Sequence, residues 1–277
     1  MSKNLYIDAS NQNETRVVLK KDNHIEDYEY ESINNTLIKN NIYLGKVSRI
    51  EPSLQAAFVD FGRERHGFLS FNDIQSDYYQ LPQSDLEKIN NEKKFPSKRY
   101  KIQEVIKPNQ VILVQVLKDE RGFKGAALST FISIAGKYIV LMPNTAKGGG
   151  ISRKIFNPGD RKKIRKILNE IEIPKEMGII VRTAGSNKTK NEIDGDLKNL
   201  ITVWNSIKDN ALNSIAPALI HQESDIIKRS IRDMYDDETQ NIIVEGNEGY
   251  QKAKNYIKLM MPKQLKKVKK YREKIPL

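Results

Sequence analysis

Cysteine is absent from this sequence of 277 residues, and histidine occurs only at His24, His66 and His221. The first absence excludes disulfide bonds, thiolate chemistry and cysteine-ligated zinc, and the wide spacing of the histidines argues against a histidine metal cluster. Long hydrophobic runs are also missing: there is no window of about 18 apolar residues, and no hydrophobic signal core opens the chain. The sequence therefore predicts a cytoplasmic protein without a membrane span or a secretion signal.

Positive charge is present in excess. The formal net charge is +12 and the pI is about 9.5, which indicates a polyanionic partner. The excess is concentrated between Gln251 and Leu277, where ten lysines and arginines accompany a single acid, Glu273. Two interpretations of this lysine-rich tail remain open: it contacts nucleic acid, or it is a solvated terminal segment.

The most informative stretch lies between Asn41 and Ile74. Three short apolar runs are separated there by the turn-like sequences Glu-Pro-Ser and Gly-Arg-Glu-Arg, a pattern that predicts consecutive strands of a small β-barrel. Alternation places Phe58 and Phe68 on the outer face of these strands. The basic residues nearby are Lys46, Arg49, Arg63 and Arg65. Paired rings beside cations are typical of an OB-fold surface for single-stranded nucleic acid; alternatively, both rings cap the barrel core or pack under a neighbouring domain.

Extended segments are also expected on both sides of this stretch. Residues 1–36 contain three strand-like segments that are too short to bury a core alone, so they need a partner elsewhere in the chain. Residues 75–99 form a polar insertion, either a solvated loop or a short helix. Barrel strands are predicted to resume within residues 101–120.

The second half of the chain predicts an α/β pattern. Asp160 is expected to cap a helix that ends before Pro174. Residues 193–207 carry an apolar stripe at helical spacing. A strand at 241–245 and a helix at 250–260 follow, and this strand can pair with the N-terminal strands.

Several long motifs resemble one family. The sequence GKVSRIEPSLQAAFVDFGRERHGFL is similar to the S1-type RNA-binding domain of bacterial ribonuclease E/G. The sequences KGAALSTFISIAGKYIVLMP, GGISRK and VRTAG resemble the part of that family that senses the 5′ end of RNA, and APALIHQESDIIKRSIRDMY resembles its return into an RNase H-like subdomain. The resemblance implies an α+β multidomain fold, in which an RNase H-like α/β subdomain carries an inserted S1-type OB-fold β-barrel and a 5′-sensor subdomain. The implied boundaries are 1–36 and 228–277 for the RNase H-like subdomain, 37–130 for the S1 domain and 131–227 for the 5′-sensor.

Seven positions hold the residue type that the family uses to contact RNA. They are Phe58, Phe68 and Lys124 on the S1 surface, and Gly136, Val140, Arg182 and Thr183 in the 5′-phosphate sensor. The chemistry suits Arg182, because a guanidinium offers a rigid fork to phosphate oxygens. From residue type alone, however, a structural ion pair is the favoured interpretation of Arg182.

No catalytic residue is assigned within the chain. The pair His221 and Glu223 is expected to be structural, and the aspartates at 233, 236 and 237 lack a defined set of metal ligands. The resemblance implies that the complete family enzyme holds magnesium on aspartates, and zinc at a link between subunits, in segments beyond Leu277. Phosphodiester hydrolysis depends on that metal, so we expect this chain to bind no metal, and to bind RNA without cleaving it.

Three functions compete at this stage. The first is an endoribonuclease of the ribonuclease E/G type for RNA processing and decay, whose catalytic segment lies outside this sequence. The second is a stand-alone module that binds RNA or senses its end. The third is a nonspecific nucleic-acid binder that uses the lysine-rich tail. The expected partners are single-stranded RNA and, for the first function, a catalytic segment or further copies of the chain.

Overall fold

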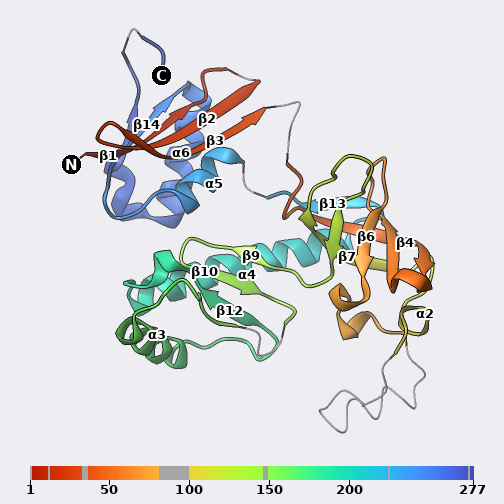
Figure 1. Ribbon diagram of the computed structural model, residues 1–277. Helices are drawn as coiled ribbons and strands as arrows, with labels where there is room; N and C mark the ends of the chain where they lie inside the picture. The colour runs from red at the N-terminus through yellow and green to blue at the C-terminus, as the bar shows by residue number, and fades with distance from the viewer. Residues whose placement is uncertain are drawn as a thin grey trace.

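In the residues that it describes, the computed structural model of the chain contains three β-sheets, each with its own hydrophobic core (Figure 1). The residues that the structure describes are 2–11, 13–32, 37–80, 100–145, 149–223, 225–273 and 275–277. Most of the predicted insertion at 75–99 lies outside them. The chain starts in a five-stranded sheet, passes through a β-barrel and a four-stranded sheet, and then returns to the first sheet.

The five-stranded sheet brings the two ends of the sequence together. Its strands in spatial order are β15 (Val268–Lys270), β14 (Thr239–Glu245), β1 (Lys3–Asp8), β2 (Glu14–Lys21) and β3 (His24–Ser32). β14 pairs in parallel with β1, which confirms that the N-terminal strands have their partner near the C-terminus. Helices α5 (Ile226–Asp233) and α6 (Asn247–Met260) pack against the sheet and share its core with Leu5, Ile7 and Val244.

Part of the lysine-rich tail belongs to this sheet. The 3₁₀ segment η6 (Pro262–Lys267) leads into β15, which pairs in parallel with β14. The Val268 side chain of β15 is buried. Lys267 Nζ donates to the main-chain oxygen of Thr239 (2.6 Å) and lies 5.4 Å from the Tyr235 ring centroid. Residues 268–270 of the tail therefore form an edge strand of the sheet, and the interpretation of the whole tail as a solvated segment is wrong.

The predicted barrel is confirmed. It is built from β4 (Ile42–Glu51), β5 (Ala56–Asp60), β6 (Gly67–Ser70), β8 (Ala127–Ser129) and β7 (Val111–Lys118). Since β4 pairs with both β5 and β7, the sheet closes on itself. Alternation is as expected, because Ala57, Val59 and Leu69 are fully buried in the barrel core. A further strand, β13 (Ala218–His221), pairs with the start of β4.

The segment at 101–120 differs from the prediction at its start. Its residues Ile102–Val105 form a short helix, α2, and the strand β7 begins only afterwards. The Lys101 main-chain nitrogen donates to Glu104 Oε2 (2.9 Å), which closes the first turn. Ile102 and Val105 are both fully buried, and their spacing of three places both side chains on one side of a helical turn.

The four-stranded sheet lies between the other two in the sequence. Its order is β11 (Gly149–Ile151), β12 (Gly178–Val181), β10 (Ile139–Met142) and β9 (Ile134–Ala135). Helix α4 (Lys190–Leu212) packs on β9 and β10, and α3 (Pro158–Glu170) contacts β11. The predicted stripe on α4 is confirmed, since Ile193, Leu197 and Ile207 are buried in this core.

The cap predicted for α3 is wrong by three residues. Asn157 is the N-cap residue, and its side chain accepts a hydrogen bond from Gly159 N (2.8 Å). Asp160 lies inside the first turn, where its charge suits the positive end of the helix dipole. Pro158 is the first helical residue, a position that proline favours. The helix ends at Glu170.

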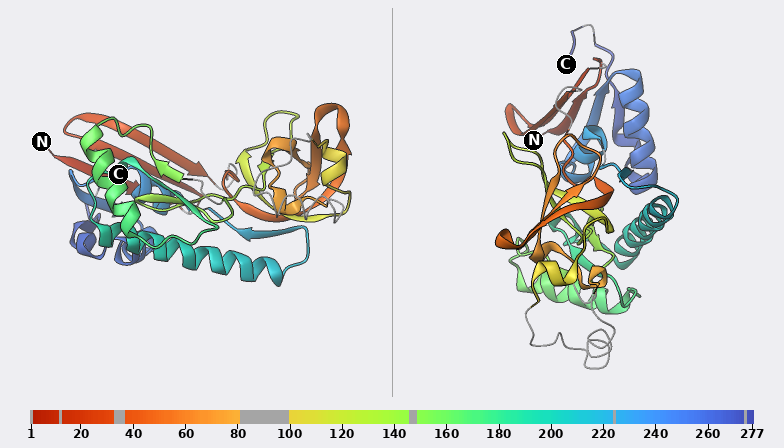
Figure 2. Two further views of the ribbon diagram at one scale, coloured as in Figure 1. Left: turned by 90° about the horizontal axis from the view of Figure 1, so that it is seen from below. Right: turned by 90° about the vertical axis from the view of Figure 1, so that its right-hand side faces the viewer.

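Helix α4 connects two of the sheets. At 23 residues it is about 34 Å long, and it runs from the four-stranded sheet toward β13 beside the barrel (Figure 2). The five-stranded and four-stranded sheets lie at one end of the molecule and the barrel at the other. Among the described residues, no helix is both long and apolar enough to cross a bilayer.

Candidate nucleic-acid interface

Two phenylalanines form a ring pair on the outside of the barrel. Phe58 of β5 and Phe68 of β6 are directly opposite each other, with ring centroids 6.0 Å apart and ring planes at 76°. The Arg49 guanidinium lies 4.4 Å from the Phe58 centroid. Phe68 is 36% exposed and Phe58 is half-buried, whereas their strand neighbours are buried. Both rings therefore point outward as predicted, and they are not enclosed in the barrel core.

A tight turn places Lys124 near this ring pair. Arg121 and Lys124 bond each other through their main chains, and Gly122 adopts a φ of 57°, which glycine tolerates best. Arg65 donates to the Gly122 carbonyl from the barrel side. Two residues after Lys124, the Ala126 carbonyl accepts a hydrogen bond from Phe68 N (2.8 Å). Lys124 is exposed, two residues along the chain from this main-chain contact with Phe68.

Sequence reasoning missed an aromatic residue in this turn. Phe123 is 99% exposed, immediately before Lys124. A large ring that is left fully in water on a rigid turn is unusual. The available signal was its position between Gly122 and Lys124, next to the motif that carried the resemblance.

The loop that contains Gly136 is held by a buried carboxylate of α4. Asp196 accepts hydrogen bonds from the main-chain nitrogens of Lys137 (3.3 Å), Tyr138 (2.8 Å) and Ile139 (3.1 Å). A Cβ atom at Gly136 would lie 2.6 Å from Asp196 Oδ2, so only glycine fits there. Burial raises the pKa of Asp196, against the effect of these three hydrogen bonds. Asp196 was not predicted as a site residue; the available signal was an acid within the apolar stripe of α4.

Arg182 lies directly after β12 and contacts this loop. Its Nη1 donates to the Gly136 carbonyl (2.7 Å), and its Nη2 pairs with Asp233 Oδ1 (2.5 Å) at the end of α5. Arg232 binds the other oxygen of Asp233 (2.9 Å). Burial opposes ionisation of Asp233, but its bonds to the two arginines outweigh that effect and lower its pKa. The guanidinium of Arg182 is thus in an ion pair, the arrangement that residue type alone favoured.

The predicted sensor residues are only partly brought together. Arg182 and Gly136 are joined by a hydrogen bond, and Thr183 follows Arg182 as the first, exposed residue of η5 (Thr183–Gly185). Val140 lies in β10 opposite Ile180 of β12. The ring pair lies on β5 and β6 of the barrel, whereas Arg182 follows β12 of the four-stranded sheet, and these two units are separate in the molecule (Figure 1). Any RNA that contacts both has to span the two units.

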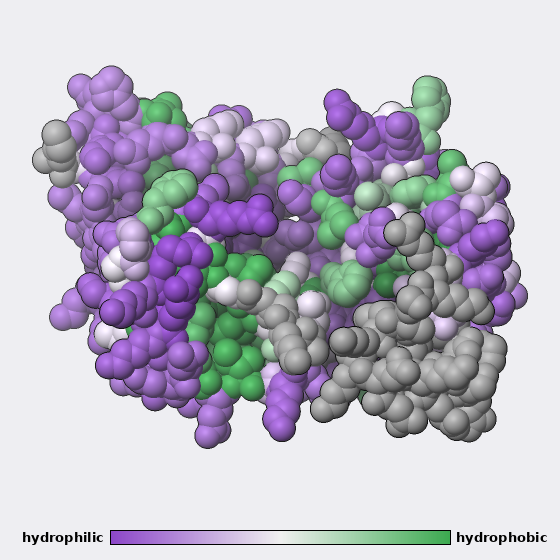
Figure 3. Space-filling model, turned by 60° about the horizontal axis from the view of Figure 1, so that its bottom comes forward, coloured by the Kyte–Doolittle hydropathy of each residue, from purple (hydrophilic) through white to green (hydrophobic). Residues whose placement is uncertain are grey.

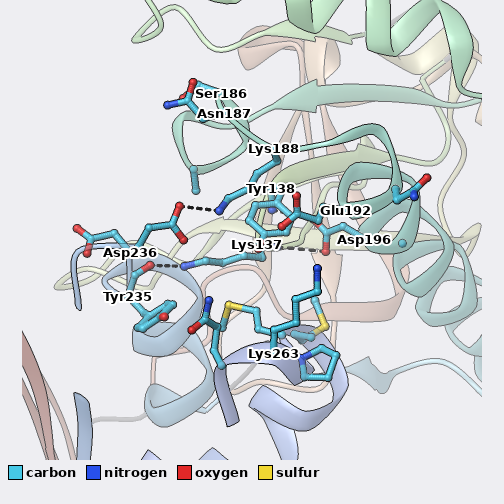
Figure 4. Close-up of a pocket in the computed structure, with 18 of the residues that line it drawn as sticks. Lys137, Tyr138, Ser186, Asn187, Lys188, Glu192, Asp196, Tyr235, Asp236 and Lys263 are labelled. Carbon is cyan, nitrogen blue, oxygen red and sulfur yellow. Dashed lines mark hydrogen bonds and ion pairs between the residues drawn. The ribbon is translucent and has the colours of Figure 1, made fainter. Parts of the chain in front are cut away.

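A cavity of about 570 Å³ adjoins Thr183. Tyr138 and Lys137 line one side, and Tyr235 and Asp236 of the five-stranded unit line another (Figure 4). Lys188 Nζ bridges the two sides through an ion pair with Asp237 (2.6 Å). Among the predicted sensor residues only Thr183 lines this cavity; Gly136 lines a separate one of about 550 Å³.

The pair His221 and Glu223 forms part of the packing beside β13. Burial lowers the pKa of His221, and the charge of Glu223 opposes that shift. Glu223 also forms an ion pair with Arg232 (2.9 Å), whose side chain is almost completely buried. The carboxylate is therefore committed to neutralising a buried cation, as expected of a structural group.

A closed five-stranded barrel with an exposed ring pair beside cations defines an S1-type RNA-binding domain, and the model of the S1 RNA binding domain matches residues 36–131. The Ribonuclease E/G family model matches residues 133–277. The chain belongs to the ribonuclease E/G family.

Curated relatives agree with this assignment. Ribonuclease E of Haemophilus influenzae is 42% identical over 275 residues, which are 99% of this chain and 28% of that protein. Ribonuclease E of Escherichia coli is 41% identical over 276 residues, or 99% of this chain and 25% of that protein. The putative ribonuclease E of Buchnera aphidicola subsp. Baizongia pistaciae is 39% identical over 253 residues, which are 91% of this chain and 59% of that protein. The chain thus spans about a quarter of the first two of these relatives and less than two thirds of the third.

The family resemblance implies a bound magnesium ion. The carboxylates in the described part of the chain are not arranged to hold one. No three His, Cys, Asp or Glu side chains in that part are grouped so that they could hold a metal ion. The aspartates near the end of α5 each pair with a cation instead: Asp233 with Arg182, Asp236 with Lys3 and Asp237 with Lys188. Carboxylates that are neutralised in this way are not preorganised as magnesium ligands.

Proposed function

We propose that this chain is the RNA-binding part of an endoribonuclease that acts in RNA processing and decay. In this proposal residues 37–130 form the S1 domain, 131–227 form a 5′-sensor, and 1–36 with 228–277 form an RNase H-like subdomain. The observation that carries the proposal is the outward ring pair of Phe58 and Phe68 on the closed barrel. A cytoplasmic location and a zinc link between subunits of the complete enzyme remain parts of the same proposal.

The ring pair supplies a stacking surface for bases. Every base has a π-face, so aromatic side chains hold single-stranded RNA with little dependence on sequence. Lys124 is exposed two residues from Ala126, the main-chain partner of Phe68, and its ammonium group can attract the phosphates between stacked bases. Double-stranded RNA cannot stack on the rings because its bases are already paired and stacked.

Arg182 and Thr183 would sense the 5′ end by exchanging one anion for another. In the structure the guanidinium is neutralised by Asp233, a carboxylate with a single charge. A terminal monophosphate carries about −1.5 to −2 charges at pH 7 and offers three acceptor oxygens. It can therefore compete with Asp233 for Arg182 and also accept from the Thr183 hydroxyl. A 5′ hydroxyl lacks that charge and cannot compete.

Cleavage is proposed to depend on residues outside this sequence. Metal-assisted phosphodiester hydrolysis needs carboxylates that hold magnesium at fixed geometry, and the described carboxylates form no such group. We expect the purified 277 residues to bind RNA without cutting it. Magnesium-dependent cleavage by this chain alone would contradict that expectation. The alternative is a stand-alone RNA-binding or end-sensing module, in which case adding the catalytic segment of a relative would restore no cleavage.

The test of end sensing compares one single-stranded RNA in its 5′-monophosphate and 5′-hydroxyl forms. Arg182→Ala is expected to remove the preference of the wild-type chain for the monophosphate. Hydrogen bonds to charged groups contribute about 1.5–3 kcal/mol, so the loss should be about 10- to 100-fold in affinity for the monophosphate form. Fluorescence anisotropy titrations of both RNAs would measure it.

Two further variants make this test specific. Asp233→Asn removes the competing carboxylate, and it should raise affinity for the monophosphate form while leaving the hydroxyl form unchanged. Arg16→Ala is the matched control, because Arg16 is also an ion-paired arginine but lies on β2. If the wild-type chain binds both RNAs equally, end sensing is excluded while the stacking proposal is unaffected.

A further inference from the structure

A dense positive surface covers α3 and the loop before it. Between Arg153 and Lys166 there are seven basic residues and one acid, Asp160. We call the exposed members the α3 basic surface. They are Arg153, Lys154, Lys162, Lys163, Arg165 and Lys166. Within the part of the chain that the structure describes, none of these six side chains has an ion-pair partner.

This arrangement is unfavourable for the isolated chain. Lys162 and Lys166 are four residues apart on the helix, and Lys163 and Lys166 are three apart, so like charges repel at both spacings. The helix is held in place by its other face, where Ile164 is fully buried in the core of the four-stranded sheet. The basic face has no role in that packing. Charges that cost stability and have no ion-pair partner among the described residues are best explained by an external polyanion.

The α3 basic surface begins next to the proposed phosphate site. Ile151, the last residue of β11, pairs with Val181 of β12, and Ser152 N donates to the Val181 carbonyl (2.9 Å). Arg182 follows Val181 directly. Arg153 is two residues beyond Ile151, so it lies within about 7 Å of that strand end along the chain.

An exposed aromatic residue lies inside the same surface. Phe156 is 85% exposed, between Lys154 and the N-cap residue Asn157. Its loop is held by Arg161, whose Nη1 donates to the carbonyls of Ser152 (3.0 Å) and Ile155 (3.1 Å). A ring fixed among cations offers stacking to a base while the cations attract phosphates. This combination matches single-stranded nucleic acid more closely than it matches an acidic protein.

We propose that the α3 basic surface is a second, sequence-independent contact for single-stranded RNA, taking the phosphates of the nucleotides that follow the 5′ end. The proposal extends the RNA binding proposed above to a face remote from the ring pair. A membrane surface is disfavoured, because a basic helix that binds lipid inserts its apolar face, and the apolar face of α3 is already buried. Figure 3 shows the molecule with its bottom turned forward, and strongly hydrophilic side chains gather on the left of that view.

The experiment replaces three lysines of α3 together, as Lys162→Gln, Lys163→Gln and Lys166→Gln, in the full chain. Affinity for a 5′-monophosphorylated single strand of about 16 nucleotides, the upper end of an OB-fold site, is titrated at several salt concentrations. Each lost phosphate contact lowers the slope of log affinity against log salt by about 0.7, so the slope should fall by about 2. Over 50 to 200 mM salt the wild-type affinity should then drop about 20-fold more than that of the variant.

The matched control removes three exposed lysines from the five-stranded unit, as Lys254→Gln, Lys258→Gln and Lys269→Gln. This control should retain most of the wild-type slope. Equal losses in both triple variants would overturn the proposal in favour of nonspecific attraction. An unchanged slope in a folded α3 variant would also overturn it. If the α3 variant instead lost binding to anionic vesicles but kept its affinity for RNA, the surface would be a membrane contact, and the proposal would again be overturned. Phe58→Ala is titrated in parallel to test the two proposals separately. If Phe58→Ala weakens RNA binding and the α3 variant does not change the slope, the ring-pair proposal stands and the α3 proposal fails. Phe156→Leu should weaken binding without changing the slope, since it removes stacking but no charge.

Discussion

Replacing Phe58 and Phe68 by alanine together is expected to weaken binding of single-stranded RNA by at least 30-fold. Base stacking on an aromatic side chain contributes about 1–3 kcal/mol per base, so two rings correspond to about 2–6 kcal/mol and to roughly 30-fold to more than 10³-fold in affinity. Phe68 is 36% exposed and Phe58 is half-buried, and the strands beneath them belong to a closed barrel core. The loss should therefore appear in affinity, while the unfolding transition changes little.

The control for this effect is another phenylalanine of equal exposure. Phe131 is 37% exposed, against 36% for Phe68, but it lies after β8 and outside the ring pair. Phe131→Ala should leave affinity within about twofold of wild type, as for a surface substitution outside the contact. The salt dependence of the double variant should match that of wild type, because no charge is removed. A comparable loss in Phe131→Ala, or none in the double variant, would refute the stacking surface.

The barrel and its ring pair were predictable because they depend on short-range patterns. Strand alternation fixes which side chains face the core, so Val59 and Leu69 inside imply Phe58 and Phe68 outside. The directly opposite placement of the two rings also follows from a short connection between β5 and β6. By contrast, Asp160 was assigned as a helix cap although Pro158 indicated a helix start one residue after Asn157.

The network around Arg182 could not be predicted in the same way. Asp196 is 58 residues from Tyr138, and Asp233 is 51 residues from Arg182. The first contact depends on how α4 packs on β10, and the second on how the four-stranded and five-stranded units pack, which no local periodicity encodes. The tail is a similar case. Val268 becomes part of a sheet only because β14 offers it a free edge, whereas its lysine-rich surroundings left a nucleic-acid contact and a solvated terminus both open.

Lys137 leads to the second large prediction, which concerns pH. Its Nζ is buried and donates to the main-chain oxygens of Arg232 (2.9 Å), Ile231 (3.3 Å) and Tyr235 at the end of α5. Burial, and then repulsion by Arg182, lowers the pKa of Lys137 from 10.5 to about 8. Below pH 8 the amine is protonated in both the folded and the unfolded chain, so the full cost of burying the charge is present. Between pH 8 and 10.5 the unfolded chain binds more protons, so stability rises with pH in this window.

The variant Lys137→Gln keeps a donor for these carbonyls and removes the titration. The free energy of unfolding of wild type minus that of Lys137→Gln should be constant below pH 8 and increase by about 2–3 kcal/mol up to pH 10.5, at 1.36 kcal/mol per pKa unit. Burial raises the pKa values of Tyr138 and Tyr235 to about 12, so both proteins lose stability above pH 10, and this loss cancels in the difference. Urea unfolding across this range would measure it, with Lys208→Gln on the exposed side of α4 as control. A flat difference would show that the Lys137 amine is charged in the folded chain throughout, held by the α5 carbonyls strongly enough to offset its burial.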